Sequence, residues 1–317
     1  MRHVMISIVI PLYNERESLS PLHEALGRVL SGMGKGYELI FVDDGSTDGS
    51  LKALEGLHAA DPEHVTVISL RRNYGKSAAL ATGFEAARGE YVVTMDADLQ
   101  DDPAEVPKLL AKLGEDCDLV SGWKFPRRDP LTKRLPSRVI NGLTARLTGI
   151  DIHDMNCGLK AYKAEVVKGL ALYGEQHRFI PALAHAKGFK VDEVKVLHHP
   201  RKFGRTKFGA KRFVEGIFDL ITVLFITRYI RKPLHFFGVA GLFLLTLGGC
   251  AMAYLAAGWF MGRWIGDRPL FILSVLMMII GIQFISTGLL GEMLTSLTHR
   301  SSGVTIRKTL KAGGGAG

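Results

Sequence analysis

Two aspartates separated by a single residue stand at the end of an apolar run and could bind a metal ion. Asp96 and Asp98 close that run, and Gln100 comes two residues later. Alternation along an extended backbone would place Asp96 and Asp98 on the same side. Two carboxylates and an amide oxygen are hard ligands that suit Mg²⁺ or Mn²⁺, and water and substrate phosphates usually complete such a site. The alternative is a solvated acidic turn before a helix, with Asp102 as N-cap and Pro103 at the first helical position.

The elements that would position these acids alternate regularly along the first part of the chain. Short and nearly continuous apolar runs, typical of strands covered on both faces, occur at residues 6–11, 37–42, 65–70 and 90–95. A helical pattern lies between each run and the next. This alternation predicts an α/β fold of the Rossmann-like type, a mostly parallel sheet with helices on both faces. Ligands of such sheets bind at the carboxyl ends of the strands, where the polar loops of this chain fall.

The ends of these strands carry residues that suit a nucleotide. Tyr13 offers a ring for stacking, and Glu15 offers an acceptor. Asp43 and Asp44 can accept hydrogen bonds from a base or a ribose, and Lys76 can reach a phosphate at a helix N-terminus. The alternatives are a capped turn for the two acids and plain surface charge for the lysine. The chain has neither the glycine pattern of a dinucleotide site nor a P-loop, so a dehydrogenase is unsupported.

Charge and cysteine content narrow the class of protein further. The 317 residues carry a formal net charge of +9, and the three cysteines have no spacing typical of metal ligands. A disulfide framework is therefore not expected, which fits a reducing compartment, and the first residues predict no signal peptide. The basic residues cluster beside apolar segments without an aromatic platform between them. This pattern favours a membrane surface or anionic substrates over nucleic acid.

The last third of the chain predicts a membrane hairpin. Residues 236–261 and 269–291 contain no charged residue, and each run exceeds the roughly 20 residues that cross a bilayer. The segment 262–268 is only long enough for a turn, so both flanks lie on one side. They carry more Lys and Arg than the turn, which places both termini in the cytoplasm. Residues 208–231 suit an amphipathic helix in the interface or one packed on the catalytic domain, and glycines in the two runs could pack helices or a second copy of the chain.

Four motifs standing in a fixed order resemble the inverting, family 2 glycosyltransferases with a GT-A fold. They are Ile10-Pro11-Leu12-Tyr13-Asn14-Glu15, Phe41-Val42-Asp43-Asp44-Gly45-Ser46-Thr47-Asp48, Arg72-Asn73-Tyr74-Gly75-Lys76 and Asp96-Ala97-Asp98-Leu99-Gln100. Within that family, the chain is similar to the polyprenyl-phosphate glycosyltransferases, which include dolichyl-phosphate mannose synthase. The resemblance runs from about residue 5 to 210, and the membrane tail extends it. It implies a GT-A sheet followed by an interfacial helix and two transmembrane helices.

The resemblance also implies how the donor would be held. It gives Asp96, Asp98 and Gln100 to a Mg²⁺ or Mn²⁺ ion. A basic segment that begins at His199 resembles the part of the family that closes over the nucleotide diphosphate. The residues implied to bind the nucleotide are Pro11, Tyr13, Glu15, Asp43, Asp44, Lys76, Asp96, Arg201, Arg205 and Lys207. A metal site at His198 and His199 is the alternative for that segment, but no carboxylate or cysteine adjoins them in the sequence.

On the acceptor side, the resemblance implies a basic site for a lipid phosphate. That site would consist of Lys124, Arg127, Arg134 and Arg138. Lys124 stands where relatives often have Arg, so Arg127 and Arg134 are favoured, and the alternative is a basic surface on anionic lipid. Asp154 matches the family's acid, and we assign it to orienting the substrate, because an ionised lipid phosphate needs no general base; a cap is its alternative. The implied catalytic residues are Asp98, Asp154, Arg127 and Arg134.

Taken together, these features predict inverting transfer of one sugar from a nucleotide sugar to a polyprenyl phosphate, undecaprenyl or dolichyl, at the cytoplasmic face of the inner membrane. A UDP-hexose is favoured over GDP-mannose as the donor. The alternatives are a glycosyltransferase with another lipid or glycan acceptor, and a non-catalytic scaffold that binds nucleotide sugar or lipid. A homo-oligomer is possible. The predicted divisions are a catalytic domain at 1–207, interfacial helices at 208–233, a hairpin at 234–294 and a tail at 295–317.

Overall fold

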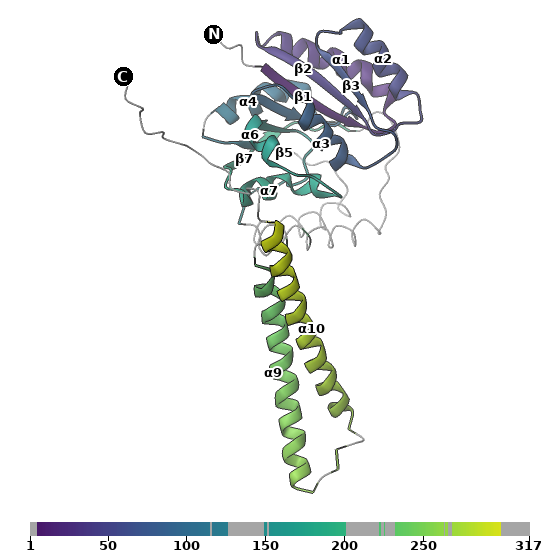
Figure 1. Ribbon diagram of the computed structural model, residues 1–317. Helices are drawn as coiled ribbons and strands as arrows, with labels where there is room; N and C mark the ends of the chain where they lie inside the picture. Colours follow the sequence, from purple (N-terminus) through teal and green to yellow (C-terminus); the bar gives the residue numbers. More distant parts are fainter. Residues whose placement is uncertain are drawn as a thin grey trace, which may run out of the picture. The chain divides into compact units, whose positions relative to one another are not determined.

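The computed structural model describes residues 5–114, 116–125, 149–150, 152–200, 222, 225, 232–262, 264–265 and 268–298. The chain divides into two units, Met1–Val223 and Leu224–Gly317. The first unit holds a sheet with its covering helices, and the second holds two long helices (Figure 1). The interfacial helix predicted at 208–231 falls almost entirely outside the described residues.

A seven-stranded mixed sheet in the order β3-β2-β1-β4-β6-β5-β7 forms the first unit. Its strands are β1 (Met5–Leu12), β2 (Gly36–Asp43), β3 (Val65–Ser69), β4 (Tyr91–Thr94), β5 (Leu119–Lys124), β6 (Lys160–Lys163) and β7 (Val191–Val196). The strands β1 to β4 are parallel, β6 runs antiparallel to both β4 and β5, and β7 is parallel to β5. The predicted α/β sheet is confirmed. The sequence did not predict β6, because this strand is short and two of its four residues are lysines.

Helices cover both faces of this sheet, as predicted (Figure 1). The described helices of the unit are α1 (Arg16–Ser31), α2 (Ser50–Ala60), α3 (Lys76–Ala86), α4 (Val106–Gly114), α6 (Ala164–Gly169) and α7 (Ile180–Ala186). Leucines of α1, α2 and α4 share one apolar cluster with alternate residues of β1, such as Ile8 and Ile10. Val9 points to the other face, where a Cβ added to Gly83 of α3 would meet its Cγ1 at 2.3 Å. Glycine at that position therefore lets α3 lie close to the sheet.

The α1 helix shows why these residues fold in this way. Leu19, Leu22, Leu26 and Leu30 recur at helical spacing and are fully buried, while Glu17 and Arg28 stand at the two ends. Each buried leucine contributes about 1.5–3 kcal/mol relative to an exposed one. The face that these leucines form fixes α1 against the sheet, and the chain entering α1 carries Tyr13 and Glu15.

Local capping differs in detail from what the sequence suggests. Asp102 accepts a hydrogen bond from Ala104 N at 2.9 Å, with Pro103 at the first position of the short 3₁₀ helix Pro103–Glu105, so the predicted cap is confirmed, whereas Asp98 and Asp101 are buried and not solvated. The segment that starts at Gln176 forms a 3₁₀ turn, Gln176–Phe179, followed by α7. Pro181 fits the start of α7, where a missing N–H costs nothing.

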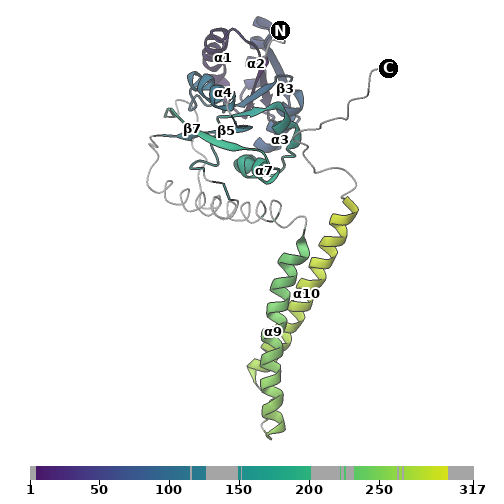
Figure 2. The ribbon, with the colours of Figure 1, turned by 90° about the vertical axis from the view of Figure 1, so that its left-hand side faces the viewer.

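The second unit contains α9 (Pro233–Phe260) and α10 (Pro269–Thr298) side by side (Figures 1 and 2). Both helices are long and apolar enough to cross a membrane, and they contain the two predicted runs. A Cβ added to Gly241 would lie 2.6 Å from Gly281 O, and one added to Gly281 would lie 2.7 Å from Gly241 O. The small residues therefore let the two backbones touch. At one end, Glu292 accepts a hydrogen bond from Leu234 N at 3.4 Å and so helps to satisfy the N-terminus of α9.

Candidate active site

A cleft of about 270 Å³ lies where β1, β2, β3 and β4 end. The residues that line it include Pro11, Tyr13, Glu15, Asp44, Lys76, Asp96 and Asp98. All seven belong to the set that the sequence proposes for donor or metal. The carboxyl end of the sheet is the place where the parallel order of these strands predicts a ligand. Asp43 and Gln100, also proposed for this role, are not part of the lining described for the cleft.

The two acids of the central motif reach the cleft through a turn, not through strand alternation. The chain leaves β4 at Thr94, turns at residues 97–98, and gives Leu99 a positive φ of 60°. The prediction that an extended backbone places Asp96 and Asp98 on the same side is therefore wrong, because the backbone turns at residues 97–98. Both side chains nevertheless line the same cleft, because the tight turn folds the second acid back beside the first.

Asp96 is held ionised by a lysine at the start of α3. Its Oδ1 forms an ion pair with the Lys76 ammonium. Burial alone would raise the pKa of Asp96, but the charge and hydrogen bond of Lys76 lower it to about 2. The carboxylate is thus negative at neutral pH and already has a cation beside it. A hard divalent cation bound in the cleft would meet the same negative oxygens.

The neighbouring residues fit such a cation without enclosing it. Asp98 Oδ1 accepts a hydrogen bond from Gln100 N at 3.2 Å, which braces the turn. Gln100 Nε2 donates to His199 O at 3.3 Å, so its Oε1 is the atom that could serve as a ligand. Among the residues that the structure describes, no three His, Cys, Asp or Glu side chains group as a complete metal site. This donor set suits an ion that substrate phosphates and water complete.

The acids after β2 hold loops in place. Asp44 accepts hydrogen bonds from Tyr74 N at 2.7 Å and from Gly75 N at 2.9 Å. Asp43, which is buried, accepts from Ser46 N at 3.0 Å and from Ser69 Oγ at 3.1 Å. Asp44 therefore supports the loop that delivers Lys76, in addition to lining the cleft. The turn alternative is confirmed for Asp43, but neither Ser46 nor Asp48 is the N-cap of α2, a position taken by Gly49.

Two turn residues lock the loops after β1, β2 and β3 to one another. Asn14 adopts a positive φ of 59°, and its side chain accepts a hydrogen bond from Thr47 N at 2.8 Å. Gly45 also has a positive φ, and a Cβ there would lie 2.6 Å from the carbonyl carbon of Arg72. The sequence did not single out Asn14 for a role. Its place inside the first of the four motifs was the available signal.

On the other side of the sheet centre, Asp154 is buried on a braced segment. Its carbonyl accepts from Ser121 Oγ at 3.3 Å, and the neighbouring His153 is clamped by Glu193, with His153 N 2.7 Å from Oε2 and Nδ1 2.5 Å from Oε1. The His153 ring also stacks on Trp123, with ring centroids 4.0 Å apart. A hydrogen-bonded and stacked frame therefore fixes the backbone of Asp154.

Lys124, at the end of β5, stands among the acids of the site. Its Nζ is 4.0 Å from Asp101 Oδ1. Burial alone would lower the pKa of Lys124, but the carboxylates of Asp101, Asp154 and Asp96 raise it well above its usual range. Lys124 is therefore an ammonium at neutral pH. The remaining basic residues assigned to acceptor or nucleotide lie outside the described residues: Arg127, Arg134, Arg138, Arg201, Arg205 and Lys207.

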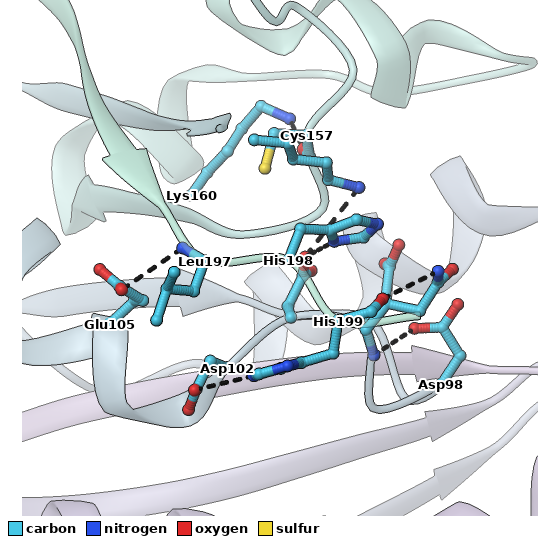
Figure 3. A network of polar contacts seen from close by, with 12 residues as sticks. Asp98, Asp102, Glu105, Cys157, Lys160, Leu197, His198 and His199 are labelled. Atoms are coloured by element: carbon cyan, nitrogen blue, oxygen red, sulfur yellow. Dashed lines mark hydrogen bonds and ion pairs between the residues drawn. The ribbon is translucent and has the colours of Figure 1, made fainter. Parts of the chain in front are cut away.

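The two histidines after β7 do have acidic neighbours, contrary to the sequence-based expectation. His199 Nε2 lies 3.0 Å from Asp102 Oδ2, and His198 Nδ1 lies 3.4 Å from Asp101 Oδ1 (Figure 3). The partners come from a loop about a hundred residues away, so their proximity could not be seen in the linear sequence. Asp101 is a site residue without a role in the sequence-based prediction, and His198 was considered there only as a metal ligand. The signal for Asp101 was its place in a run of acids that starts at Asp96.

Behind Asp96 lies a void of about 10 Å³, room for one water molecule at most. His177 and Lys160 are among its lining residues. Burial lowers the pKa of His177 to about 2 and that of Lys160 to about 8. His177 is therefore neutral, and its Nδ1 lies 3.1 Å from Ser77 Oγ. Lys160 donates to Cys157 O, which ties β6 to the segment before it.

Comparison with known proteins assigns the chain to a family. The family profile described as "Glycosyl transferase family 2" matches residues 7–170, more than half of the chain. The chain belongs to glycosyl transferase family 2. The predicted family and its catalytic class are thereby confirmed, and the matched region contains Asp96, Asp98 and Asp154.

Curated relatives of this family 2 glycosyltransferase cover nearly its whole length. The dodecaprenyl-phosphate galacturonate synthase of Rhizobium johnstonii is 38% identical over 300 residues, covering 93% of this chain and 89% of the relative. The undecaprenyl-phosphate 4-deoxy-4-formamido-L-arabinose transferase of Shewanella sediminis is 38% identical over 295 residues, covering 90% and 86%. Both alignments are too long to be confined to the sheet unit.

Solved structures of the GT-A class confirm the fold. One is the glucosyl-3-phosphoglycerate synthase of Mycobacterium tuberculosis in complex with Mn²⁺, UDP-glucose and phosphoglyceric acid. It is 21% identical, with a TM-score of 0.54, and the match covers 71% of this chain and 79% of that one. At this identity the likeness establishes the shared fold alone.

Proposed function

We propose that this family 2 glycosyltransferase transfers a single sugar from a nucleotide sugar to a polyprenyl phosphate, with inversion at the anomeric carbon. The observation that carries the proposal is one chain that combines a polar cleft containing Asp96, Asp98 and Lys76 with two helices of membrane-crossing length. A water-soluble donor suits the cleft, whereas an acceptor that resides in a bilayer suits the helices. Relatives that match over both parts carry names of dodecaprenyl- and undecaprenyl-phosphate sugar transferases.

For the donor, we propose a UDP-sugar bound with Mg²⁺ or Mn²⁺. Support comes from the ligand types at the cleft and from a GT-A structure named with Mn²⁺ and UDP-glucose. Asp96 and Asp98 would hold the ion, with Gln100 Oε1 as a further ligand. Such an ion, when bound, neutralises the negative charge that develops on a diphosphate leaving group.

The chain's own residues then have distinct tasks. Lys76, at the N-terminus of α3, would move its charge from Asp96 toward the diphosphate, where the helix dipole also favours an anion. Tyr13 and Glu15 would meet the nucleoside, and Lys124 would meet the acceptor phosphate together with Arg127, Arg134 and Arg138.

No residue is needed to remove a proton from the acceptor. A polyprenyl phosphate is ionised at neutral pH and can attack directly, so Asp154 would orient the substrate. His177 is neutral and lies near 3 Å from Ser77, and we give it a structural role.

We also propose that α9 and α10 form a transmembrane hairpin with both ends in the cytoplasm, an arrangement that puts the cleft on the side where nucleotide sugars are made. The predicted divisions at residues 207, 233 and 294 stay part of this proposal, as does a homo-oligomer. Reporter fusions at the two termini test the topology. A cytoplasmic signal at both ends is expected, and a periplasmic signal at either end would reject the hairpin.

A transfer assay tests the central proposal. Purified full-length protein in detergent is incubated with undecaprenyl phosphate, Mg²⁺ or Mn²⁺, and a panel of UDP- and GDP-sugars. We expect one donor to give a product that requires both the metal and the lipid phosphate. Transfer that proceeds equally well to a diacylglycerol or a glycan would assign another acceptor. Donor binding without any transfer would favour the scaffold function.

A further inference from the structure

Asp101 is a buried carboxylate that makes no side-chain hydrogen bond to the residues that the structure describes. Its side chain is only 1% exposed, and neither oxygen accepts a hydrogen bond within the described part of the chain. A buried anion in this state is costly unless positive charge compensates it. The sequence analysis gave Asp101 no role, and the tasks proposed above do not use it. Its environment therefore calls for an explanation.

Two side chains from different strand ends face Asp101. Lys124 Nζ, at the end of β5, lies 4.0 Å from Asp101 Oδ1, and His198 Nδ1, after β7, lies 3.4 Å from the same oxygen. These separations allow attraction but are too long for a good hydrogen bond. No hydrogen bond joins Lys124 Nζ to another described residue. Its N–H donors are therefore still available to an anionic ligand, although the ammonium itself is held.

The backbone keeps Asp101 in this place. Asp101 pairs with His198 in an antiparallel bridge, and His199 N donates to Gln100 O at 2.7 Å. Figure 3 shows Leu197, His198 and His199 running along the loop that bears Asp98 and Asp102. Leu197 N also donates to Glu105 Oε1 at 3.3 Å. The acidic loop is thus held against the end of β7, and the backbone of Asp101 is fixed there.

Gly158 brings the same carboxylate close to the donor side of the site. A Cβ added at Gly158 would lie 2.6 Å from Asp96 Oδ2 and 2.9 Å from Asp101 Oδ2. The two acids therefore face one point from different sides. Lys76 balances Asp96, whereas Lys124 and His198 face Asp101. Each acid therefore forms its ion pair with a different lysine.

We propose that Asp101 is a positioning residue that fixes the Lys124 ammonium beside the site of the acceptor phosphate. This inference rests on the proposed function, in which Lys124 meets that phosphate. Lys124 has a flexible four-carbon stem, and a free ammonium would lose side-chain entropy on binding. An anion placed 4 Å behind it removes that loss in advance, without occupying its N–H donors. Asp101 touches neither substrate and acts through Lys124.

A double-mutant cycle tests this role. Full-length Asp101→Asn, Lys124→Gln and the double variant are assayed with undecaprenyl phosphate at saturating donor. Asp102→Asn is the matched control, since it makes the same chemical change one residue along, pairs with His199, and leaves an amide that can still cap the 3₁₀ helix.

We expect Asp101→Asn to raise the acceptor KM on the order of tenfold, as for other residues that orient a ligand group. The donor KM and the Mn²⁺ concentration for half-maximal rate should change less than about twofold, since the metal and donor sites are left intact. The double variant should be no worse than Lys124→Gln, because Asp101 has no further task once Lys124 is gone. Asp102→Asn should match the unsubstituted protein.

Several results would overturn the inference. If the effects of the two single substitutions on acceptor KM add in the double variant, Asp101 acts independently of Lys124. A shifted Mn²⁺ dependence in Asp101→Asn would make Asp101 part of the metal site. If Asp101→Asn alone fails to fold, the double variant, which removes both charged groups, is compared with Lys124→Gln. An acceptor KM that is higher in the double variant than in Lys124→Gln contradicts the positioning role of Asp101. A working unsubstituted enzyme in which Lys124→Gln leaves acceptor KM unchanged rejects this inference alone, whereas no transfer by the unsubstituted protein rejects the proposed function.

Discussion

The two halves of the sheet organise their charged residues in opposite ways. In the parallel half, β1 to β4, the two acids at the end of β2 accept hydrogen bonds from backbone N–H groups: Asp44 from Tyr74 and Gly75, and Asp43 from Ser46. Facing the ends of β5 and β7 in the mixed half, Asp101 of the loop after β4 accepts no hydrogen bond in the described chain and lies 4.0 Å from Lys124 Nζ and 3.4 Å from His198 Nδ1. The acids after β2 are fixed by short hydrogen bonds, whereas Asp101 interacts with its neighbours at longer range.

This difference matches the two ligands that we propose. A nucleotide sugar presents many fixed hydrogen-bonding groups, and a site for it gains from loops whose shape is set before binding. A lipid phosphate presents one compact anion, and a site for it needs positive charge with unused donors. The comparison therefore predicts that substitutions in the parallel half disturb donor binding and loop order. Those in the mixed half should disturb acceptor binding or strand pairing.

The largest effect should come from the residue that the proposed metal site needs most. Asp98→Asn removes one of two carboxylate ligands but keeps the size of the side chain. We expect a loss of transfer of at least about a hundredfold, in the range found when a preorganised electrostatic group is removed. Thermal unfolding should shift little, because Asp98 faces the cleft. A variant that retains transfer near the level of the unsubstituted protein would reject the metal role of Asp98.

The next largest loss of transfer is expected for a substitution at Gly158, which lies beside both Asp96 and Asp101. Gly158→Ala would place a methyl group within 3 Å of the carboxylates of Asp96 and Asp101 and force them apart. We expect the rate of transfer to fall about tenfold to a hundredfold. Both the donor KM and the acceptor KM should rise, because the methyl group displaces the carboxylates of Asp96 and Asp101. Gly56→Ala in α2 meets no atom within 4 Å and is the matched control, expected to be neutral or slightly stabilising. Equal, small effects of both variants would show that the two halves are not coupled at Gly158.

A smaller effect, confined to the parallel half, is expected at Asp44. Asp44→Ala leaves Tyr74 N and Gly75 N without their acceptor, and each lost partner costs about 1–2 kcal/mol when water replaces it only in part. The loop that delivers Lys76 should loosen, so we expect a raised donor KM together with a lower unfolding temperature. Asp44→Asn keeps one acceptor oxygen, so its donor KM and unfolding temperature should lie between those of the unsubstituted protein and Asp44→Ala. A raised acceptor KM with unchanged donor KM would contradict the division into halves.

The parallel half was largely predictable from the sequence. Continuous apolar runs gave four strands, and Leu19 to Leu30 in α1 show the helical spacing that covers them. The mixed half was harder, because β6 (Lys160–Lys163) has no apolar run and pairs with β4 and β5 from a distant part of the chain. Its pairing depends on tertiary contacts such as Thr94 Oγ1 to Gly158 O at 2.9 Å, which no local pattern encodes.

The candidate site divides in the same way. The motif residues Tyr13, Lys76, Asp96 and Asp98 were found because each follows a recognisable strand. Asp101 was missed, and His198 was not linked to it, because their proximity depends on a bridge between residues 97 positions apart. A rule that links residue type to local spacing finds acids near a turn, but it does not show which of them is buried without a hydrogen bond. That property appears only in the folded chain.

The smallest effect is expected at Asp118, an acid of the mixed half that does accept hydrogen bonds. Asp118, just before β5, accepts from Lys190 N at 2.9 Å and from Lys163 Nζ at 2.9 Å, and so joins the ends of β5, β6 and β7. Burial alone would raise the pKa of Asp118, but these bonds lower it, so the ionised form stabilises the fold. We expect Asp118→Asn to cost about 1 kcal/mol at pH 7, since an amide replaces one acceptor by a donor.

The pH dependence of that cost separates the charge of Asp118 from its shape. A carboxyl whose pKa is lowered by folding contributes its stability above the unfolded pKa, near 4, and loses it as the pH falls through the folded value. The difference in unfolding temperature between the unsubstituted protein and Asp118→Asn should therefore be full at pH 7 and shrink below about pH 4. Transfer kinetics should change little, because Asp118 lies at the opposite end of β5 from Lys124. A difference that persists unchanged at pH 3 would mean that the geometry of the side chain, and not its charge, holds these three strands together.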